Sequence, residues 1–320
     1  MKKVAIVGYA QHPILENAGA LNEVELIMPV VHQLFDELGI NQNNIDFTCS
    51  GSCDYLQGAA FAFVEGLSAI QTNPPIKESH VEMDAAWAMY ESMLKIQMGD
   101  ADTALIYGFG KSSPGRLDSI ISLQMDPYYI SPLWPDRVSL AGLQAKVLLE
   151  KNIITPEQMI TAVIEARTNS KNNKNALVTE LVDKDAYLSS EKISSPLNEF
   201  DCPPISDGSS AMIIASEEKA YEFTDHPIFI EGIDHRIESS NIGSRDLSKP
   251  AGILASIEQL KLEKTKFDVA ELHTQFSHEV PYLQSVLNLN DVPTNLSGGP
   301  LVGNVMMCAC LLYTSDAADE

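Results

Sequence analysis

The pattern of hydrophobic and polar positions is clearest between residues 79 and 110. Residues 80–83 alternate in polarity as a half-buried strand does, and from Ala85 onward apolar residues recur at helical spacing. Residues 101–107 form an apolar run that is typical of a strand buried on both faces. The pattern predicts a strand, a helix and a second strand joined by very short turns, which is a βαβ unit.

The turn between the first strand and the helix is of a sharp kind that often carries a nucleophile at its tip. Here the tip holds Asp84, Ala85, Ala86 and Trp87, so it offers neither a thiol nor a hydroxyl group. Two interpretations of these residues stay open. In one, Asp84 caps the helix and Trp87 packs; in the other, both belong to a functional site.

The remaining pattern predicts further α/β structure in chain order. The predicted helices cover residues 21–38, 57–70, 139–150, 156–169, 250–260 and 278–287. The predicted strands cover residues 4–7, 45–48, 211–215, 228–233 and 269–272. Pro29 should kink the first helix or mark its start, Thr155 should cap the helix that follows it, and Asp207 should fix a turn at residues 206–208.

Residues 111–137 have no clear periodicity, but they contain Tyr128, Tyr129, Trp134 and several prolines. A long aromatic loop inside a compact chain is typical of a lid over a site or of a contact between subunits. Both interpretations remain open. An aromatic lid would suit an apolar acyl or sterol group.

Charge and composition narrow the classes of function. The formal net charge of −23 makes binding of nucleic acids and anionic membranes unfavourable. No apolar run reaches the roughly 20 residues that span a bilayer, so we expect a cytoplasmic protein. An anionic ligand would need a local basic patch, for which the candidates are Lys111, Arg116, Arg236 and Arg245.

The five cysteines include no CxxC pair, so they predict neither a disulfide framework nor a zinc site. Cys49 and Cys53 lie in the segment TCSGSC, after a predicted strand. Packing of small apolar side chains and a reactive thiol are both compatible with this segment.

Several segments, in this order, resemble the thiolase superfamily, and specifically its sterol-carrier-protein-x or lipid-transfer-protein branch. They are MKKVAIVGYAQHP, GDADTALIYGFGKSS, PPISDGSSAMIIAS, VAELHTQFSHE and NLSGGPLVGN. The resemblance implies an α/β thiolase fold with five αβαβα layers and two similar halves. We expect the first half with its lid loop at residues 1–220 and a truncated second half at residues 221–309. Residues 310–320 resemble translated adapter sequence and are expected to be a non-native tail.

The resemblance also implies where chemistry should occur. Thiolases combine a nucleophilic cysteine, a Gly-His-Pro histidine and a late cysteine, but here Ala85 and Asn304 occupy the first two positions. The late cysteine segment is missing, and no catalytic cysteine is assigned. His273 matches the histidine of the HDCF segment, which holds the thioester oxygen, and Asp84 is the preferred proton carrier. The expected substrate-binding residues are Trp87, Tyr128, Tyr129, His278, Gly298, Gly299 and Asn304.

The function implied by the resemblance has three forms. The first is an enzyme of lipid or steroid side-chain metabolism that cleaves or forms a carbon-carbon bond of an acyl-CoA ester without a cysteine acyl-enzyme. The second is an acetyl-CoA acetyltransferase or related acyltransferase, and the third is a non-catalytic acyl-CoA or sterol carrier or partner subunit. We expect no cofactor or metal, with acyl-CoA as substrate. We also expect a homodimer, and a small OB-fold protein with a zinc ribbon as a further partner.

Overall fold

The computed structural model describes residues 2–57, 61–72 and 75–305. These residues form two compact units, and the chain passes between them more than once. The first unit contains the residues up to Gly115, residues 205–231 and Val305. The second contains Arg116–Pro204 and Gly232–Asn304. The domain limits expected at residues 220 and 309 remain a prediction.

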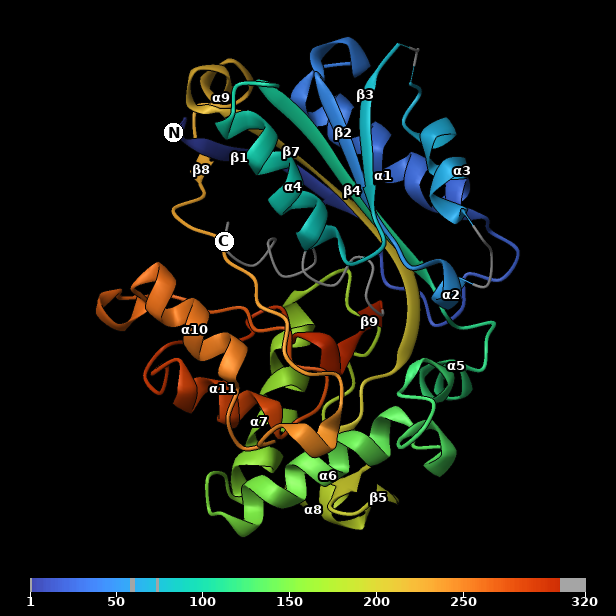
Figure 1. The fold of residues 1–320 in the computed structure, drawn as a ribbon, viewed down its shortest axis with the longest axis vertical. Coiled ribbons are helices and arrows are strands. Elements are labelled where there is room, and N and C mark those ends of the chain that lie inside the picture. Colours follow the sequence, from blue (N-terminus) through green and yellow to red (C-terminus); the bar gives the residue numbers. More distant parts are fainter. Residues whose placement is uncertain (1, 58–60, 73–74, 306–320) are drawn as a thin grey trace. The chain divides into compact units, whose positions relative to one another are not determined.

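The first unit is built on one mixed sheet with the strand order β3-β2-β4-β7-β1-β8, shown in Figure 1. Strand β2 runs parallel to β3 and β4, whereas β7 runs antiparallel to β4 and β1. A further short strand, β9, pairs with β7. The strands are β1 (Val4–Gln11), β2 (Phe47–Gly51), β3 (Lys77–Val81), β4 (Thr103–Lys111), β7 (Ile205–Ser216), β8 (Ile228–Phe229) and β9 (Asn304–Val305).

Helices cover both faces of this sheet. Helices α1 and α3 pack on the face that carries Leu105 and Tyr107, and α4 packs on the opposite face, where Gly51 approaches Ala85. Strand β4, at the centre of the sheet, is therefore buried on both faces, which explains its apolar run. The helices of this unit are α1 (Glu23–Leu38), α2 (Asp54–Gln57), α3 (Ala62–Ala69), α4 (Ala85–Gln97) and α9 (Glu217–Phe223).

The predicted βαβ unit is present as β3, α4 and β4. Helix α1 also forms as predicted; Asn22 and Glu25 close its start with a capping box, and Pro29 lies within it. The predicted helix at 57–70 is α2 followed by α3, and residues 58–60 lie outside the described part. One side of this region faces solvent, since Phe61 is 68% exposed and Val64 is 49% exposed.

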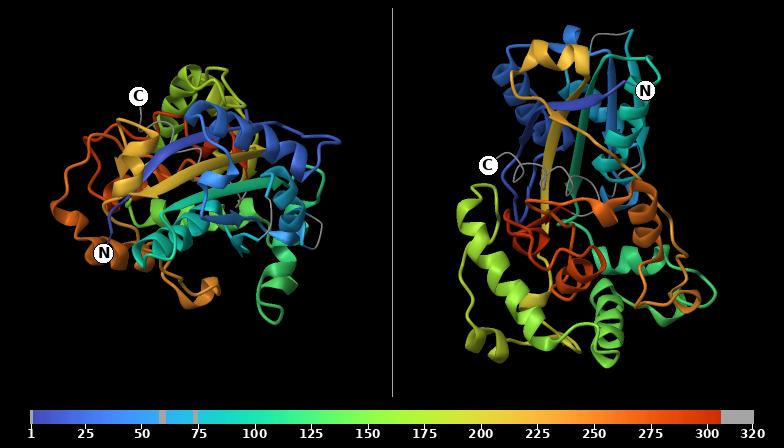
Figure 2. Two further views of the ribbon diagram at one scale, coloured as in Figure 1. Left: turned by 90° about the horizontal axis from the view of Figure 1, so that it is seen from above. Right: turned by 90° about the vertical axis from the view of Figure 1, so that its left-hand side faces the viewer.

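The predicted turn at residues 206–208 is wrong, because these residues belong to the twelve-residue strand β7, which runs beside β1 and β4 in Figure 2. Asp207 is buried there and does bind backbone N–H groups, but they come from other segments. Its Oδ2 accepts from Ala18 at 2.8 Å and its Oδ1 from Ser113 at 3.0 Å. Long-range pairing of β7 overrides the local turn signal of Ser-Asp-Gly.

The second unit is mainly helical. One apolar cluster joins Val138 and Leu148 of α6, Met159 of α7, Tyr282 of α11, and Phe276 from the segment before α11. Its elements are α5 (Leu117–Gln124), α6 (Arg137–Glu150), α7 (Pro156–Asn169), α8 (Lys184–Ser189), β5 (Lys192–Ser194), β6 (Leu197–Asn198), α10 (Ala251–Leu260) and α11 (Glu279–Val286). Helix α7 has the predicted limits, with Thr155 as its cap.

The strands predicted in the second half are corrected by the structure. Residues 228–233 form only the two-residue strand β8. Residues 269–272 form no strand, and their only ladder contact among the described residues is a single parallel bridge between Ala270 and Thr294. The polar residues Glu271 and Asn295 tie this region together through side-chain hydrogen bonds instead.

Candidate functional site

The sharp turn between β3 and α4 is held by close contact of two backbones. A Cβ atom placed on Gly51 of β2 would lie 2.7 Å from the backbone nitrogen of Ala85, so only glycine fits here. Ala85 is fully buried at the start of α4. The turn thus has the compact geometry of a nucleophile elbow, but its tip carries a methyl group in place of a thiol.

Asp84 is the N-cap of α4. Its Oδ1 accepts a hydrogen bond from the Ala86 N–H at 3.0 Å, and its backbone oxygen accepts from the Trp87 N–H at 2.9 Å. Both Asp84 and Trp87 are partly buried. The capping interpretation of Asp84 therefore describes its contacts, and a catalytic role for it stays a prediction.

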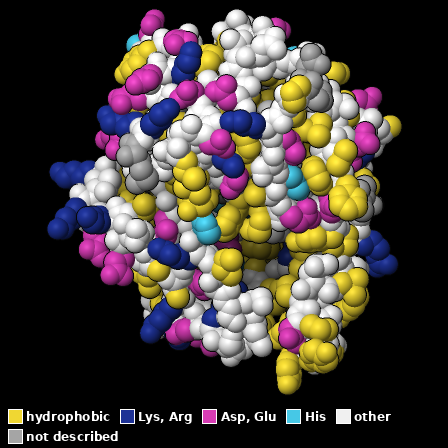
Figure 3. All heavy atoms as spheres, turned by 45° about the horizontal axis from the view of Figure 1, so that its top comes forward, with side chains coloured by type: hydrophobic (Ala, Val, Ile, Leu, Met, Phe, Trp, Pro, Cys, Tyr) yellow, Lys and Arg dark blue, Asp and Glu magenta, His cyan; other side chains and the backbone are white. Residues whose placement is uncertain are grey.

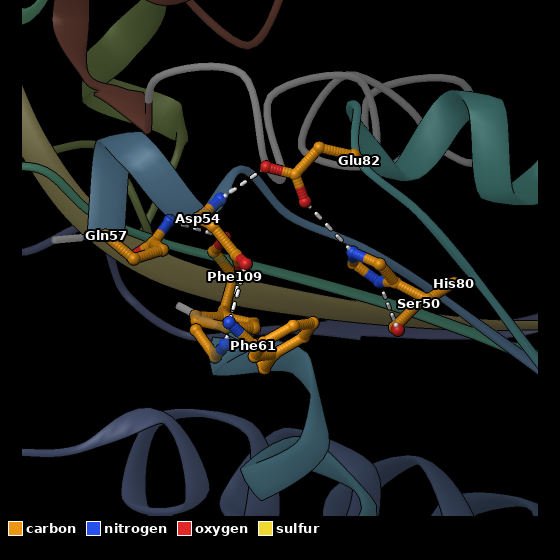
Figure 4. Close-up of polar contacts among 8 residues, drawn as sticks. Ser50, Asp54, Gln57, Phe61, His80, Glu82 and Phe109 are labelled. Carbon is orange, nitrogen blue, oxygen red and sulfur yellow. Dashed lines mark hydrogen bonds and ion pairs between the residues drawn. The ribbon is translucent and has the colours of Figure 1, made fainter. Parts of the chain in front are cut away.

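A polar network joins β2, β3 and the start of α2 (Figure 4), and the sequence pattern does not reveal it. Ser50 and His80 face each other on paired strands, with 2.9 Å between Oγ and Nδ1. The other ring nitrogen, Nε2, lies 3.3 Å from Glu82 Oε2, and the ring stacks on Phe63 at 4.1 Å. Glu82 Oε1 in turn accepts from the Asp54 N–H at 2.6 Å.

This network has the order of a serine, histidine and acid triad, but Ser50 lies inside a sheet strand and is 1% exposed. A nucleophile needs room for the reacting carbonyl, and a strand interior does not supply it. The network instead links the start of α2 to the strand that leads into the elbow. We interpret it as a clamp that fixes the elbow.

The second unit contains a cavity of about 340 Å³ next to the segment that carries His273. A cavity of this size falls within the range of small-molecule sites. The lining combines residues of α6, α10 and α11 with the segments before α10 and α11: Gln144, Arg236, Glu238, Arg245, Asp246, Leu247, Lys249, Pro250, Ile253, His273, Glu279, Tyr282 and Leu283.

His273 lies in an irregular segment that Asn295 holds in place. The Asn295 Oδ1 accepts from the Leu272 N–H at 2.6 Å, and its Nδ2 donates to Thr274 Oγ1 at 3.1 Å. Burial lowers the pKa of His273 to about 4, so its imidazole is neutral at physiological pH. A neutral imidazole in a cavity can donate a hydrogen bond from one ring nitrogen.

His278 is fully buried and does not line the cavity itself. Its Nε2 lies 3.2 Å from Gln144 Oε1, while the Gln144 amide nitrogen donates to the Leu247 oxygen at 3.1 Å. Burial lowers the pKa of His278 to about 4 as well. His278 thus orients Gln144, which does line the cavity. The expected contact of His278 with the substrate stays a prediction.

Glu279 begins α11 and lines the cavity. Its Oε2 accepts from the backbone N–H of Phe276 at 3.2 Å, and burial raises the pKa of the carboxyl to about 7. Tyr282 follows one turn later; its hydroxyl is buried without a hydrogen-bond partner among the described residues, and burial raises its pKa. The sequence does not single out Glu279, because its desolvation depends on segments far away in the chain.

Two of the four basic candidates border the cavity. Arg236 lies 3.0 Å from Asp234, and Arg245 lies 3.7 Å from Glu238. Lys111 belongs to the first unit and donates to the Leu21 oxygen, and Arg116 is exposed. On the face drawn in Figure 3, basic side chains lie among acidic ones and form no continuous basic field.

The other expected site residues lie away from this cavity or outside its lining. Tyr128 and Tyr129 are 82% and 73% exposed, and both backbone N–H groups bind Asp126. Gly298 and Gly299 have φ angles of 90° and 61°, and a Cβ on Gly299 would meet the Asn295 side chain at 2.8 Å. These glycines shape the turn against Asn295. Asn304 is buried.

Both cysteines of the segment TCSGSC are buried, which disfavours a reactive thiolate. Cys49 is fully buried, and burial raises its pKa to about 12, so it stays a thiol. Cys53 is also buried. Cys308 and Cys310 lie outside the described residues. Within the described ranges, no group of His, Cys, Asp and Glu side chains is arranged to hold a metal ion, and no helix is long and apolar enough to cross a membrane.

Several known proteins are similar to this chain in sequence. No family model matches the chain. An acetyl-CoA acetyltransferase of Methanocaldococcus jannaschii is 26% identical over 295 residues, which cover 87% of this chain and 74% of that protein. Sterol carrier protein 2 of Bos taurus is 26% identical over 211 residues, or 59% of this chain; the match spans only 39% of that longer protein.

Solved structures show the fold. A human mitochondrial 3-ketoacyl-CoA thiolase matches with a TM-score of 0.75 and 15% identity over 99% of this chain and 91% of that one. The Ltp2-ChsH2(DUF35) aldolase matches with a TM-score of 0.72 and 18% identity over 95% of this chain and 86% of that one. The fold is therefore a thiolase fold, as predicted. In sequence, the chain is similar both to acetyl-CoA acetyltransferases and to sterol-carrier and lipid-transfer proteins.

Proposed function

We propose that this protein acts on acyl-CoA thioesters and cleaves or forms a carbon-carbon bond next to the thioester carbonyl, without a cysteine acyl-enzyme. The observation that carries the proposal is Ala85, fully buried at the tip of an intact elbow. Covalent acyl transfer needs a nucleophile at this position. A thiolase fold without this nucleophile can still bind a thioester and stabilise its enolate.

The cavity of the second unit supports this chemistry. Cleavage beside a thioester carbonyl produces an enolate, whose oxygen must be stabilised by hydrogen-bond donors fixed in advance. His273 lines the cavity as a neutral imidazole, and Asn295 holds the residues on either side of it, Leu272 and Thr274. We assign the enolate oxygen to this histidine; loss of one such donor typically costs roughly 100-fold or more in rate.

Three basic side chains border the same cavity beside three carboxyl groups, and they are the candidates to bind an anionic acyl-CoA despite the net charge of −23. Arg236, Arg245 and Lys249 border it, and Arg236 and Arg245 are half-exposed, so their guanidinium groups can reach phosphate oxygens. We propose lipid or steroid side-chain metabolism in the cytoplasm as the setting. Acyl and sterol groups remain candidates for the apolar part of the substrate.

The proposal includes a homodimer. Strand β3 is an edge of the sheet of the first unit, and an unpaired edge is a surface on which a second copy can pair. One structural neighbour, the Ltp2-ChsH2(DUF35) aldolase, bears the names of two proteins joined together. We propose a small OB-fold partner with a zinc ribbon for this chain too. Light scattering of the full chain tests the dimer, and a stable monomer would exclude it.

The activity is tested by incubating the protein, with and without candidate partners, against a panel of acyl-CoA and β-hydroxyacyl-CoA esters. We expect release of an aldehyde or ketone together with a shortened acyl-CoA. His273→Ala should lower this rate by about 100-fold with an unchanged melting temperature. Acyl exchange between CoA thioesters at an ordinary enzyme rate would favour an acyltransferase, and tight binding without any turnover would favour a carrier.

A further inference from the structure

We propose that Glu279 is the residue that moves the proton in this reaction. Its carboxylate takes the proton from the β-hydroxyl group of the substrate. After the bond between the α and β carbons has broken, it returns this proton to the α carbon. The inference rests on the proposed function and adds a catalytic residue to it. The first support is position, because Glu279 and His273 line the same cavity.

The second support is the different bonding of the three carboxyl groups that line the cavity. Glu238 is 3.7 Å from the Arg245 guanidinium and accepts from the Gly252 N–H at 2.6 Å. Asp246 accepts from Lys151 at 3.1 Å and from the Ser248 hydroxyl at 2.6 Å, and these bonds hold its pKa far below the usual range. Asp246 is therefore held as an anion, and the Glu238 carboxyl group is already engaged by a cation and a backbone N–H group.

Within the described residues, the Glu279 carboxyl group has no cationic or hydroxyl partner. The contacts described for its carboxyl group are with backbone N–H groups near the start of α11, the Phe276 bond being 3.2 Å long. No ion pair to this carboxyl occurs in the described part of the chain. Burial without a cation disfavours the charged form, so this group changes its protonation state near neutral pH, as a general acid and base must.

The neighbouring groups are less suited to take the proton. Tyr282 has a raised pKa and keeps its own proton at neutral pH. His278 is bonded to Gln144 and is not part of the lining. His273 has a lowered pKa, which makes it a weak base but leaves it a hydrogen-bond donor. The division of roles is thus a carboxyl for the proton and an imidazole for the oxygen.

The step balances without a further reactant. The Glu279 carboxylate accepts the β-hydroxyl proton, the oxygen forms a carbonyl, and the electron pair of the broken carbon-carbon bond enters the thioester enolate. The enolate oxygen accepts a hydrogen bond from His273. The α carbon then takes the proton from the Glu279 carboxylic acid, so that the enzyme ends in its starting state.

The test compares Glu279→Gln with the wild-type chain. Two rates are measured: turnover of a β-hydroxyacyl-CoA, and exchange of the α protons of a saturated acyl-CoA with deuterium oxide. We expect both rates to fall by about 100-fold or more, as is usual for loss of a general acid or base, with KM changed little. The wild-type pH profile should have a limb near pH 7 that the variant lacks.

Glu258→Gln on the exposed side of α10 is the matched control and should keep both rates. Compared with Glu279→Gln, the Glu279→Asp variant should recover part of the exchange rate, because it has a carboxyl group. If Glu279 had a purely structural role, the exchange rate would not depend on the presence of a carboxyl group. Active wild type together with an equally active Glu279→Gln variant would overturn this inference and leave the proposed function intact. Wild type without turnover or exchange on the whole panel would overturn both.

Discussion

Replacing Glu279 with glutamine should change how the stability of the protein depends on pH, whatever the protein's substrate. Burial raises the pKa of this carboxyl from 4.5 to about 7 in the folded protein. Between these values the folded state holds a proton that the unfolded state has lost. Stability contributed by the protonated group is therefore present below pH 4.5 and is lost as the pH rises to about 7.

The size of the effect follows from the difference between the two pKa values. At roughly 1.4 kcal/mol for each pKa unit, the shift corresponds to about 3.5 kcal/mol. Glutamine has almost the same shape and carries no charge, so the variant does not lose this stability as the pH rises. We expect Glu279→Gln to differ little from wild type near pH 4.5 and to be more stable by up to about 3.5 kcal/mol above pH 7.

His273 and His278 act in the opposite direction and are common to both proteins. Burial lowers both pKa values from 6.5 to about 4, so the stability they contribute is lost as the pH falls through this range. In the wild type these losses and the gain from Glu279 oppose each other at acidic pH. The difference between variant and wild type cancels the histidine contribution and isolates the carboxyl.

The assay is urea unfolding at a series of pH values from 4.5 to 8, with free energies extrapolated to zero denaturant. Glu258→Gln serves as the exposed control and should give a curve parallel to wild type. If Glu279→Gln also gives a parallel curve, then Glu279 is solvated in the folded protein. That result would also remove the physical basis for its proposed catalytic role.

Three further predictions concern other parts of the chain. Tyr187→Phe should lower stability by about 1.5–3 kcal/mol in urea unfolding, because the buried Asp201 loses a hydroxyl donor at 2.8 Å. Gly51→Ala should destabilise by about 1–3 kcal/mol through overpacking, since its Cβ would meet the backbone of Ala85; normal stability would contradict the tight elbow. Mass spectrometry after incubation with acyl-CoA should find no acylated cysteine, because Ala85 replaces the nucleophile.

Much of the fold is readable from local patterns where local and tertiary preferences agree. Helix α7 combines Thr155 as cap, proline at its first position and apolar residues at helical spacing, and it forms as predicted. Residues 206–208 show the opposite case. Ser-Asp-Gly is a turn sequence, but Asp207 lies opposite Lys111 in a ladder that only the folded chain defines. Sequence alone cannot supply that pairing.

The candidate site was predictable to a smaller degree, for the same physical reason. His273 was found through its resemblance to a family segment. Glu279 and the network of Ser50, His80 and Glu82 were missed, because strand register and burial by distant segments create them. The sequence feature that points to this network is the spacing of His80 and Glu82, two positions apart in the predicted strand. Such spacing does not reveal Ser50, which lies on the neighbouring strand.

The contacts at the elbow give a further reason to place thioester chemistry elsewhere. An oxyanion site at a helix start needs backbone N–H groups that are free to bind the substrate oxygen. Here the Ala86 N–H binds the Asp84 side chain, and the Trp87 N–H binds the Asp84 backbone oxygen. These two donors at the start of α4 are engaged within the protein. We therefore propose that a thioester oxygen binds to another donor, the His273 imidazole in the cavity of the second unit, which burial keeps neutral.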